Sequence, residues 1–266
     1  MAFLQCEFHS DVLGRACSMN VLVPQKAATQ IGMESAGASG RVEYPVLYLL
    51  HGLSDNHTIW MRRTSIERYT AAYGVIVVMP NGDRSFYSDM KDGYRYWTMF
   101  SEELPQVVCN LFPASSKRED TFAAGLSMGG YGALKLALRC PERFAAAVAL
   151  SPVADPCYWF KNPDLAGMRE ELKHIFGSPE EIVANGNDLF ALSEKLMKSK
   201  SPKPRLLHIC GDQDWMISEN HHLRDHMDTI GYPGYTYQEA PGTHSWEFWD
   251  FHIQEGLRFL LEGRGQ

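Results

Sequence analysis

One stretch of the sequence has the pattern of a catalytic serine. Residues 120–132 read Asp-Thr-Phe-Ala-Ala-Gly-Leu-Ser-Met-Gly-Gly-Tyr-Gly, so an apolar run ends in Gly-x-Ser-x-Gly and continues into helix-forming residues. A strand, a sharp turn with a serine at its tip and a helix together form a nucleophile elbow. Side chains at Gly125 and Gly129 would collide with the neighbouring strand and helix. The pattern predicts Ser127 as a nucleophile, since an ordinary Gly-rich turn would explain the glycines but not the serine.

A serine hydroxyl is a weak nucleophile at neutral pH and needs a base that a carboxylate orients. In a sheet of this kind the acid and then the histidine should each follow a later strand. The predicted strand 235–239 is followed by Ala-Pro-Gly-Thr-His, which makes His244 the predicted base. The predicted strand 206–210 is followed by Gly-Asp-Gln-Asp, so Asp212 and Asp214 compete as the acid. We favour Asp214, because an aspartate directly after a strand and a glycine is often a turn former.

A tetrahedral intermediate also needs two preorganised N–H donors for its oxyanion. The first predicted donor is the backbone N–H of Met128, at the start of a helix whose dipole favours negative charge. The second should come from the loop after the first central strand, residues 46–50. There Gly52 would let the backbone approach the acyl group, so the N–H of Leu53 is the predicted donor and His51 has a structural role. An ordinary strand-ending turn is the alternative.

Two further features are candidate binding sites. We expect Trp159 to line the acyl or alcohol pocket, because aromatic side chains at a strand end supply apolar binding surface; a local packing cluster is an equal alternative. His222 and His226 have the i, i+4 spacing of metal ligands, but no glutamate stands at the right offset. None of the six cysteines forms a Cys-x-x-Cys pair. We therefore predict no metal site.

Length and composition set the broad class. The chain has 266 residues, 45% of them hydrophobic and 21% charged, as expected for one globular α/β domain. Its net charge of -7 disfavours a nucleic-acid or anionic-membrane partner. No apolar run approaches the length of a membrane span, and the first residues do not resemble a signal peptide. Scattered cysteines suit reduced thiols, so we expect a cytoplasmic protein.

The order of the predicted elements indicates the architecture. Strand-like runs alternate with helix-like segments, which predicts a mostly parallel sheet of about eight strands with helices on both faces. Residues 3–8 and 16–23 are predicted to be two antiparallel edge strands, and residues 25–40 a long mobile loop. Residues 152–203 break the alternation and are predicted to form a cap-like insertion over the strand ends, within a single domain spanning 1–266.

Three segments carry a family resemblance. Residues 48–60 (Tyr-Leu-Leu-His-Gly-Leu-Ser-Asp-Asn-His-Thr-Ile-Trp), 124–132 and 210–214 resemble the esterase D family. The similarity is greatest to bacterial tributyrin esterases and feruloyl esterases, and it extends to S-formylglutathione hydrolases and mycolyl transferases. It implies an α/β-hydrolase fold and hydrolysis of short-chain acyl esters without a cofactor. The family triad matches three positions of this chain: Ser127, Asp214 and His244.

The expected function is therefore that of a serine carboxylesterase acting on a small-molecule ester. The resemblance leaves open a thioesterase such as an S-formylglutathione hydrolase, a feruloyl esterase and an acyltransferase. A binding module without catalysis is disfavoured, because every member of the predicted triad is present. Members of the family often form homo-oligomers, so a dimer or tetramer is possible here. The segment 25–40 is longer than expected for this branch, which bears on oligomer contacts.

Overall fold

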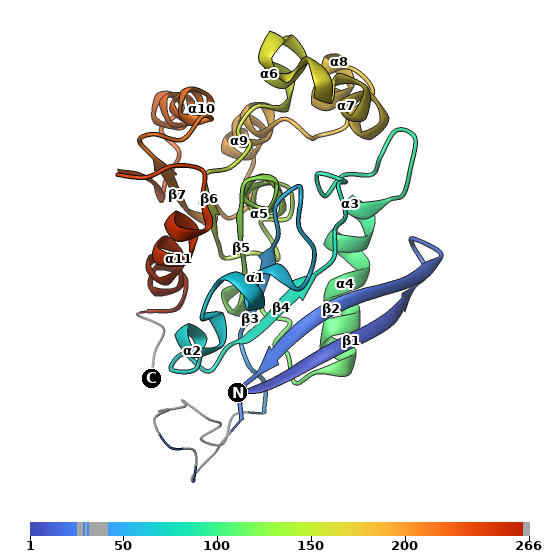
Figure 1. Ribbon diagram of the computed structural model, residues 1–266, viewed down its shortest axis with the longest axis vertical. Coiled ribbons are helices and arrows are strands. Elements are labelled where there is room, and N and C mark those ends of the chain that lie inside the picture. Colours follow the sequence, from blue (N-terminus) through green and yellow to red (C-terminus); the bar gives the residue numbers. More distant parts are fainter. Residues whose placement is uncertain (26–28, 30, 32–41, 263–266) are drawn as a thin grey trace.

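The structure is a computed structural model that describes residues 1–25, 29, 31 and 42–262. Most of the predicted loop 25–40 therefore lies outside the described residues. The described chain contains one eight-stranded sheet with the strand order β1-β2-β4-β3-β5-β6-β7-β8 (Figure 1). The strands are β1 (Ala2–Ser10), β2 (Arg15–Val23), β3 (Val46–Leu50), β4 (Ile76–Pro80), β5 (Thr121–Leu126), β6 (Ala146–Leu150), β7 (Arg205–Gly211) and β8 (Tyr235–Ala240).

The sheet is mostly parallel, as predicted. Strands β3 to β8 pair in parallel, whereas β2 pairs antiparallel with both β1 and β4. The prediction of two edge strands is therefore wrong for β2, which β1 covers on its outer side. Every residue of β3, β4, β5 and β6 is buried, because helices lie on both faces of a parallel sheet.

Two hydrophobic cores hold the helices against the sheet. One face is covered by α1 (Ile59–Arg63), α2 (Ile66–Thr70) and α11 (Trp246–Leu261). On the other face lie α4 (Leu104–Leu111), α5 (Met128–Arg139), α9 (Leu189–Lys198) and α10 (Ile217–Thr229). The short helix α3 (Tyr96–Thr98) and a π-helical turn, Met99–Glu103, lead into α4. All helices of the described chain are too short or too polar to cross a lipid bilayer.

Between β6 and β7 the chain leaves the sheet and forms α6 (Pro156–Lys161), α7 (Arg169–Phe176), α8 (Pro179–Ala184) and α9. Figure 1 shows α6, α7 and α8 grouped at the top of the view, beyond the ends of the strands. This segment corresponds to the predicted insertion 152–203. Its role as a cap over the site stays a prediction.

Candidate active site

Ser127 lies in a strained turn between β5 and α5. Its φ is 52°, a value that residues with side chains rarely adopt. The glycines allow the turn to pack closely: a Cβ on Gly129 would lie 2.4 Å from Leu50 O, and one on Gly125 would lie 2.4 Å from Gly129 O. The Ser127 N–H donates a hydrogen bond to Leu150 O at 2.9 Å. These contacts fix the serine at the carboxyl edge of the parallel strands.

An acid and a histidine meet at the same edge, after β7 and β8. His244 Nδ1 lies 2.8 Å from Asp214 Oδ2. The Asp214 side chain is buried, and its Oδ1 accepts a hydrogen bond from the Met216 N–H at 2.9 Å, which orients the carboxylate. Asp212 is exposed and accepts from the Gly242 N–H at 3.1 Å. The structure thus brings Asp214 to the imidazole and uses Asp212 to hold the neighbouring turn.

The imidazole of His244 is enclosed by two indoles. Trp249 lies edge-to-face at a ring-centroid distance of 4.7 Å, and Trp215 at 5.6 Å. Ser127 Oγ makes no hydrogen bond with His244, although both residues are described. Catalytic hydrogen bonds in unliganded enzymes are often long and tighten when the substrate binds. The structure therefore has an oriented acid–histidine pair at the sheet edge that also carries Ser127, without a hydrogen bond between Ser127 and His244.

The loop after β3 also approaches Ser127. A Cβ built on Gly52 would lie 3.8 Å from Ser127 Cβ, so the glycine allows the two backbones to come together. The Leu53 N–H donates to no acceptor within the described residues. Met128 is the first residue of α5, and N–H groups in the first turn of a helix have no intrahelical acceptor. Both predicted oxyanion donors are therefore available next to Ser127.

His51 orients the peptide that carries one of these donors. Its Nε2 accepts a hydrogen bond from the Gly82 N–H at 2.9 Å, which leaves the proton on Nδ1 to be donated to Gly52 O at 2.7 Å. Burial lowers the pKa of His51 to about 4, so this neutral tautomer persists near neutrality. In a trans peptide the C=O and N–H point in opposite directions. Holding Gly52 O therefore also sets the direction of the Leu53 N–H.

Comparison with known proteins decides the family. A family model described as a putative esterase matches residues 10–260. The chain belongs to this esterase family. It is 28% identical to an acetyl esterase of Caldicellulosiruptor saccharolyticus over 271 residues, covering 98% of each chain. It is also similar to FphF, a fluorophosphonate-binding serine hydrolase of Staphylococcus aureus, with a TM-score of 0.85, 32% identity and 98% coverage of each chain.

A further similar structure is an S-formylglutathione hydrolase (FrmB) of Staphylococcus aureus, with a TM-score of 0.82, 31% identity and coverage of 98% of this chain and 99% of that one. These findings confirm the predicted family, the α/β-hydrolase fold and the predicted class of enzyme, a serine hydrolase of carboxylic esters. The residues that carry the reaction in this esterase are inferred from the geometry of the site.

Replacing His51 with phenylalanine should lower kcat for ester hydrolysis by on the order of 10- to 100-fold, with KM almost unchanged. The reason is that a disordered oxyanion donor weakens binding of the transition state rather than of the substrate. Steady-state kinetics of His51→Phe measure the effect. His57→Phe is the matched control, because His57 lies in the same loop without contacting the peptide between residues 52 and 53. Equal kcat values for wild type and His51→Phe would rule out this role.

Trp159 is buried and belongs to an aromatic cluster next to His244. Its ring lies 5.9 Å from Phe86 and 5.9 Å from Trp215, which in turn contacts the catalytic-histidine candidate. The indole Nε1–H donates to Glu219 Oε2 at 3.0 Å. Trp159 is therefore part of a local packing cluster, which was the alternative role considered for it. Its role in lining the pocket stays a prediction. The exposed Trp215, directly after Asp214, is a second candidate for lining the substrate pocket, and the sequence did not predict it.

Glu219 should make the stability of the esterase fall as the pH rises. Burial raises the pKa of this carboxyl well above its usual value, and the nearby carboxylates of Asp155 and Asp214 add to the shift. Between the unfolded and folded pKa values the folded state holds a proton that the unfolded chain has lost. The contribution of Glu219 to the free energy of unfolding is therefore fully present below the pKa of the unfolded state. It falls by up to about 1.4 kcal/mol per pH unit as the pH rises to the pKa of the folded state.

Chemical denaturation of Glu219→Gln over a pH series tests this expectation. The amide keeps the acceptor for Trp159 but cannot ionise, so the variant should gain stability relative to wild type as the pH rises above about 4.5. Asp228→Asn, at an exposed position of the same helix, is the control. Parallel stability curves for Glu219→Gln and wild type would show that Glu219 ionises as freely in the folded esterase as in the unfolded chain.

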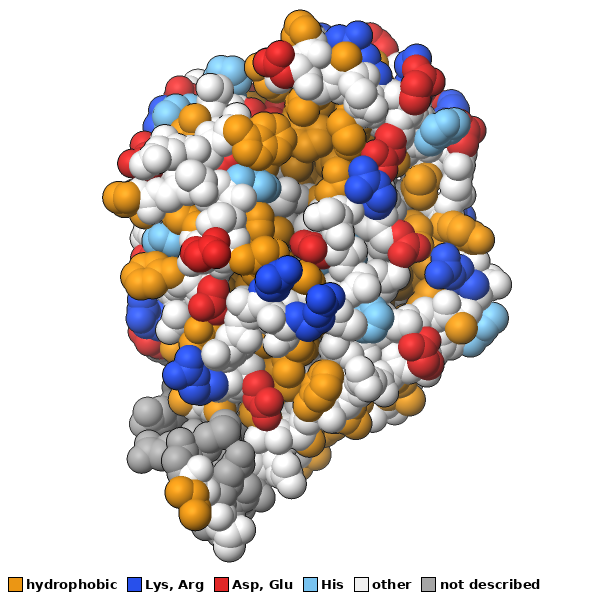
Figure 2. Space-filling model, in the orientation of Figure 1, with side chains coloured by type: hydrophobic (Ala, Val, Ile, Leu, Met, Phe, Trp, Pro, Cys, Tyr) orange, Lys and Arg blue, Asp and Glu red, His pale blue; other side chains and the backbone are white. Residues whose placement is uncertain are grey.

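A groove of about 830 Å³ opens at the loop after β3. Its walls come from that loop, from the loop after β4 and from α7 of the insertion, and they include Leu53, Asp55, Arg84, Tyr94 and Glu171. The Arg84 guanidinium forms a two-pronged ion pair with Glu171, which ties α7 to the loop after β4. Figure 2 shows hydrophobic side chains gathered in a hollow below the insertion, with charged side chains around its rim.

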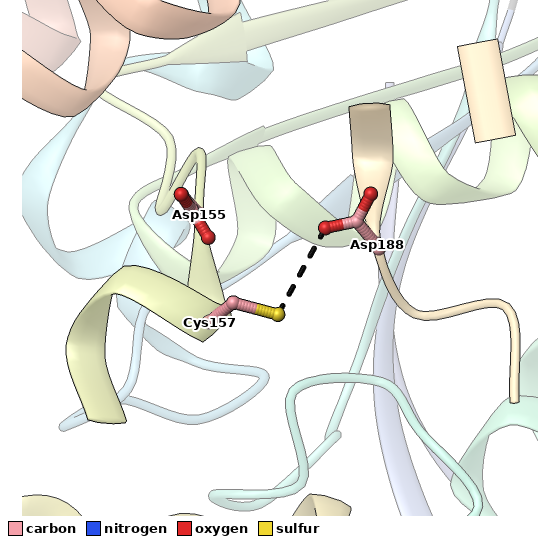
Figure 3. Close-up of side chains that lie close together, drawn as sticks. All are labelled: Asp155, Cys157 and Asp188. Atoms are coloured by element: carbon pink, nitrogen blue, oxygen red, sulfur yellow. Dashed lines mark hydrogen bonds between the residues drawn. The ribbon is translucent and has the colours of Figure 1, made fainter. Parts of the chain in front are cut away.

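A small cluster of polar side chains lies inside the insertion (Figure 3). The atoms of Asp155, Cys157 and Asp188 that could bind a metal ion lie within 4.8 Å of one another. Asp155 Oδ1 caps α6 by accepting from Tyr158 N–H, and Asp188 Oδ1 caps α9 by accepting from Ala191 N–H. Burial and the two carboxylates raise the pKa of the Cys157 thiol to about 12, so it stays protonated near neutrality. Helix capping accounts for both carboxylates, and we assign the cluster to packing of the insertion.

Proposed function

We propose that the esterase hydrolyses short-chain acyl esters through an acyl-serine intermediate, with Ser127 as nucleophile, His244 as base and Asp214 as orienting acid. The observation that carries the proposal is the 2.8 Å contact between His244 Nδ1 and Asp214 Oδ2 at the sheet edge where the elbow presents Ser127. A short acyl group is supported by the relative that bears the name acetyl esterase.

In the proposed first half-reaction, His244 Nε2 takes the hydroxyl proton of Ser127 as Oγ attacks the ester carbonyl. The carbonyl oxygen becomes an oxyanion, which the N–H groups of Leu53 and Met128 stabilise. Asp214 holds the imidazole in the tautomer with the proton on Nδ1 and stabilises the imidazolium. His244 then gives its proton to the leaving alcohol, the C–O bond breaks, and the acyl-serine remains.

In the second half-reaction a water molecule replaces the alcohol. His244 removes a proton from the water, the resulting oxygen attacks the acyl carbonyl, and the same two N–H groups receive the oxyanion. Collapse of the intermediate returns the proton to Ser127 Oγ and releases the acid. Because the two halves share one set of residues, loss of any member should slow both.

A thioester is the second candidate substrate, and the observation that favours it is the likeness to the S-formylglutathione hydrolase at 31% identity. The same residues would act on a thioester, with a thiol as the leaving group. A panel of p-nitrophenyl acyl esters from acetyl to octanoyl, methyl ferulate and S-formylglutathione separates the candidates. We expect the highest kcat/KM for acetyl to butyryl esters and a burst of p-nitrophenol. If kcat/KM is highest for S-formylglutathione, the preferred substrate is a thioester and not an ester.

An acyltransferase on the same scaffold would give a different product mixture. Adding simple alcohols to the reaction should yield mainly the free acid if water is the acceptor, and mainly the new ester if the enzyme is a transferase. Product ratios measured by chromatography test this point. We expect the acid to dominate.

A further inference from the structure

Lys135 is a buried basic residue that the proposed mechanism does not use. It lies on α5, two turns beyond Ser127, and its side chain has no solvent exposure. The Nζ atom donates hydrogen bonds to Phe86 O at 3.0 Å, to Ser88 Oγ at 2.7 Å and to Asn187 Oδ1 at 3.1 Å. These acceptors match the three N–H donors of an ammonium group. The site is thus built for a lysine, although none of the three partners is a carboxylate.

Aromatic rings complete the surroundings of this ammonium. The Nζ lies 4.7 Å from the centroid of the Tyr131 ring and 5.3 Å from that of Trp97. Such cation–π contacts stabilise a cation removed from water. Burial lowers the pKa of Lys135 well below its usual value, and the neighbouring Arg139 adds to the shift. Burying a charged group is costly unless hydrogen bonds and nearby groups compensate for the lost water, and here three hydrogen bonds and two aromatic rings do so.

The segment held by Lys135 is strained. Phe86 and Tyr87 both have a φ of 50°, in the left-handed region that residues with side chains rarely adopt. Such conformations persist only where the surroundings over-determine them, and they gather at functional sites. Lys135 binds the carbonyl of the first of these residues and the side chain of Ser88, which follows the second. The lysine therefore fixes the turn formed by residues 86–88.

This turn contacts the backbone of residues 51–53, which are called the oxyanion loop because they carry the predicted oxyanion donor. The hydroxyl of Tyr87 donates to His51 O at 2.7 Å. The rings of these two residues also lie 6.0 Å apart. His51 in turn holds the Gly52 carbonyl and so directs the Leu53 N–H. A continuous path of contacts runs from the buried ammonium through the turn to the predicted oxyanion donor.

We propose that Lys135 is a positioning residue for the oxyanion hole, and that it acts by clamping the turn 86–88 against the elbow helix. Asn187, which precedes α9, belongs to the same cluster. The clamp therefore also joins the insertion to the oxyanion loop. This inference rests on the proposed function, because it presumes that the Leu53 N–H binds the oxyanion.

The test compares Lys135→Met with Arg139→Met. Methionine keeps much of the lysine side chain's length but removes its three donors. Arg139 lies one turn further along α5, packs 4.0 Å from the Trp97 ring and binds the insertion through Gly186 O at 3.0 Å. Its hydrogen bonds do not reach the turn 86–88. It therefore controls for general loosening of the helix and the insertion.

Lys135→Met should lower kcat for p-nitrophenyl acetate by on the order of tenfold with KM little changed, since a displacement of about 1 Å can cost up to a hundredfold. Affinity for an alkyl trifluoromethyl ketone, which mimics the tetrahedral intermediate, should fall by the same factor. Arg139→Met should keep both values. A double variant that also carries Tyr87→Phe should be no slower than the slower single variant, because both act on one path.

Folded Lys135→Met with wild-type kcat and inhibitor affinity would overturn the inference, and so would an equal loss in Arg139→Met. If Lys135→Met does not fold, Ser88→Ala carries the same test, because it removes an acceptor on the turn. A lower kcat and weaker inhibitor binding in Ser88→Ala, with KM unchanged, support the clamp, and unchanged values overturn it. Full activity of Ser127→Ala would instead refute the proposed function, so the two failures are distinguishable.

Discussion

Replacing Ser127 with alanine should lower kcat for acetyl esters by on the order of 10⁵- to 10⁶-fold, the size of effect seen when a triad nucleophile is removed. No other hydroxyl occupies the tip of the elbow between β5 and α5, where an acyl group can meet both the Met128 N–H and the Leu53 N–H. Initial rates with p-nitrophenyl acetate measure the loss. Thermal unfolding is the control, because alanine keeps the backbone of the turn and should leave the fold intact.

His244→Ala should cost about as much as Ser127→Ala, and the double variant should be little worse than either. Residues that act as one unit give non-additive losses, because removing the first already abolishes the proton transfer that the second serves. Additive losses in the double variant would mean that the serine and the histidine contribute separately. Wild-type turnover in either single variant would remove that residue from the mechanism.

The second large effect concerns the choice between two neighbouring carboxylates. Asp214→Asn should lower kcat by on the order of 10⁴-fold, because an amide that donates to Nδ1 favours the wrong imidazole tautomer. Asp212→Asn is the matched control, since it keeps an oxygen that can accept from the Gly242 N–H. It should leave kcat within a few-fold of wild type. Measuring kcat for both variants across pH tests the loss of the base, and thermal unfolding shows whether the fold is kept.

A reversed pattern, with Asp212→Asn inactive and Asp214→Asn active, would contradict the assignment of the acid. The geometry argues against that outcome. Asp214 is buried, with one oxygen on His244 and the other on the Met216 N–H, whereas Asp212 is exposed in its turn. A single carboxylate therefore has both the contact and the burial that an orienting acid needs.

Local patterns were enough to predict a mostly parallel sheet with helices on both faces. The glycines of the elbow follow from close backbone approach, and parallel strands bring the segments after β5, β7 and β8 to one edge. That is why Ser127 and His244 could be proposed from their positions after predicted strands. The choice of Asp214 over Asp212 also needed turn chemistry and the family resemblance. The inner position of β2 could not be, because its pairing with β4 joins segments more than fifty residues apart.

Buried polar residues whose partners lie far along the chain were missed for the same physical reason. Lys135 lies in a helical run where a lysine suggests a solvated face, yet its partners come from the loop after β4 and from the insertion. Glu219 lies in the first turn of α10, where an acidic residue usually complements the helix dipole, yet it is buried against Trp159. Tyr87 lies in a segment rich in aromatic residues, 84–96, but the hydrogen bond from its hydroxyl to His51 O becomes evident only in three dimensions.

The most direct test of the account is to trap the acyl-enzyme and locate the modified atom. The esterase is mixed with p-nitrophenyl butyrate, quenched in acid within milliseconds and digested with trypsin for mass spectrometry. Cleavage after Arg118 and Lys135 releases a peptide whose only serine is Ser127. We predict a butyryl adduct on that serine, formed at the rate of the p-nitrophenol burst. Turnover with no adduct there, or with the butyryl group on another residue, would contradict the proposed mechanism.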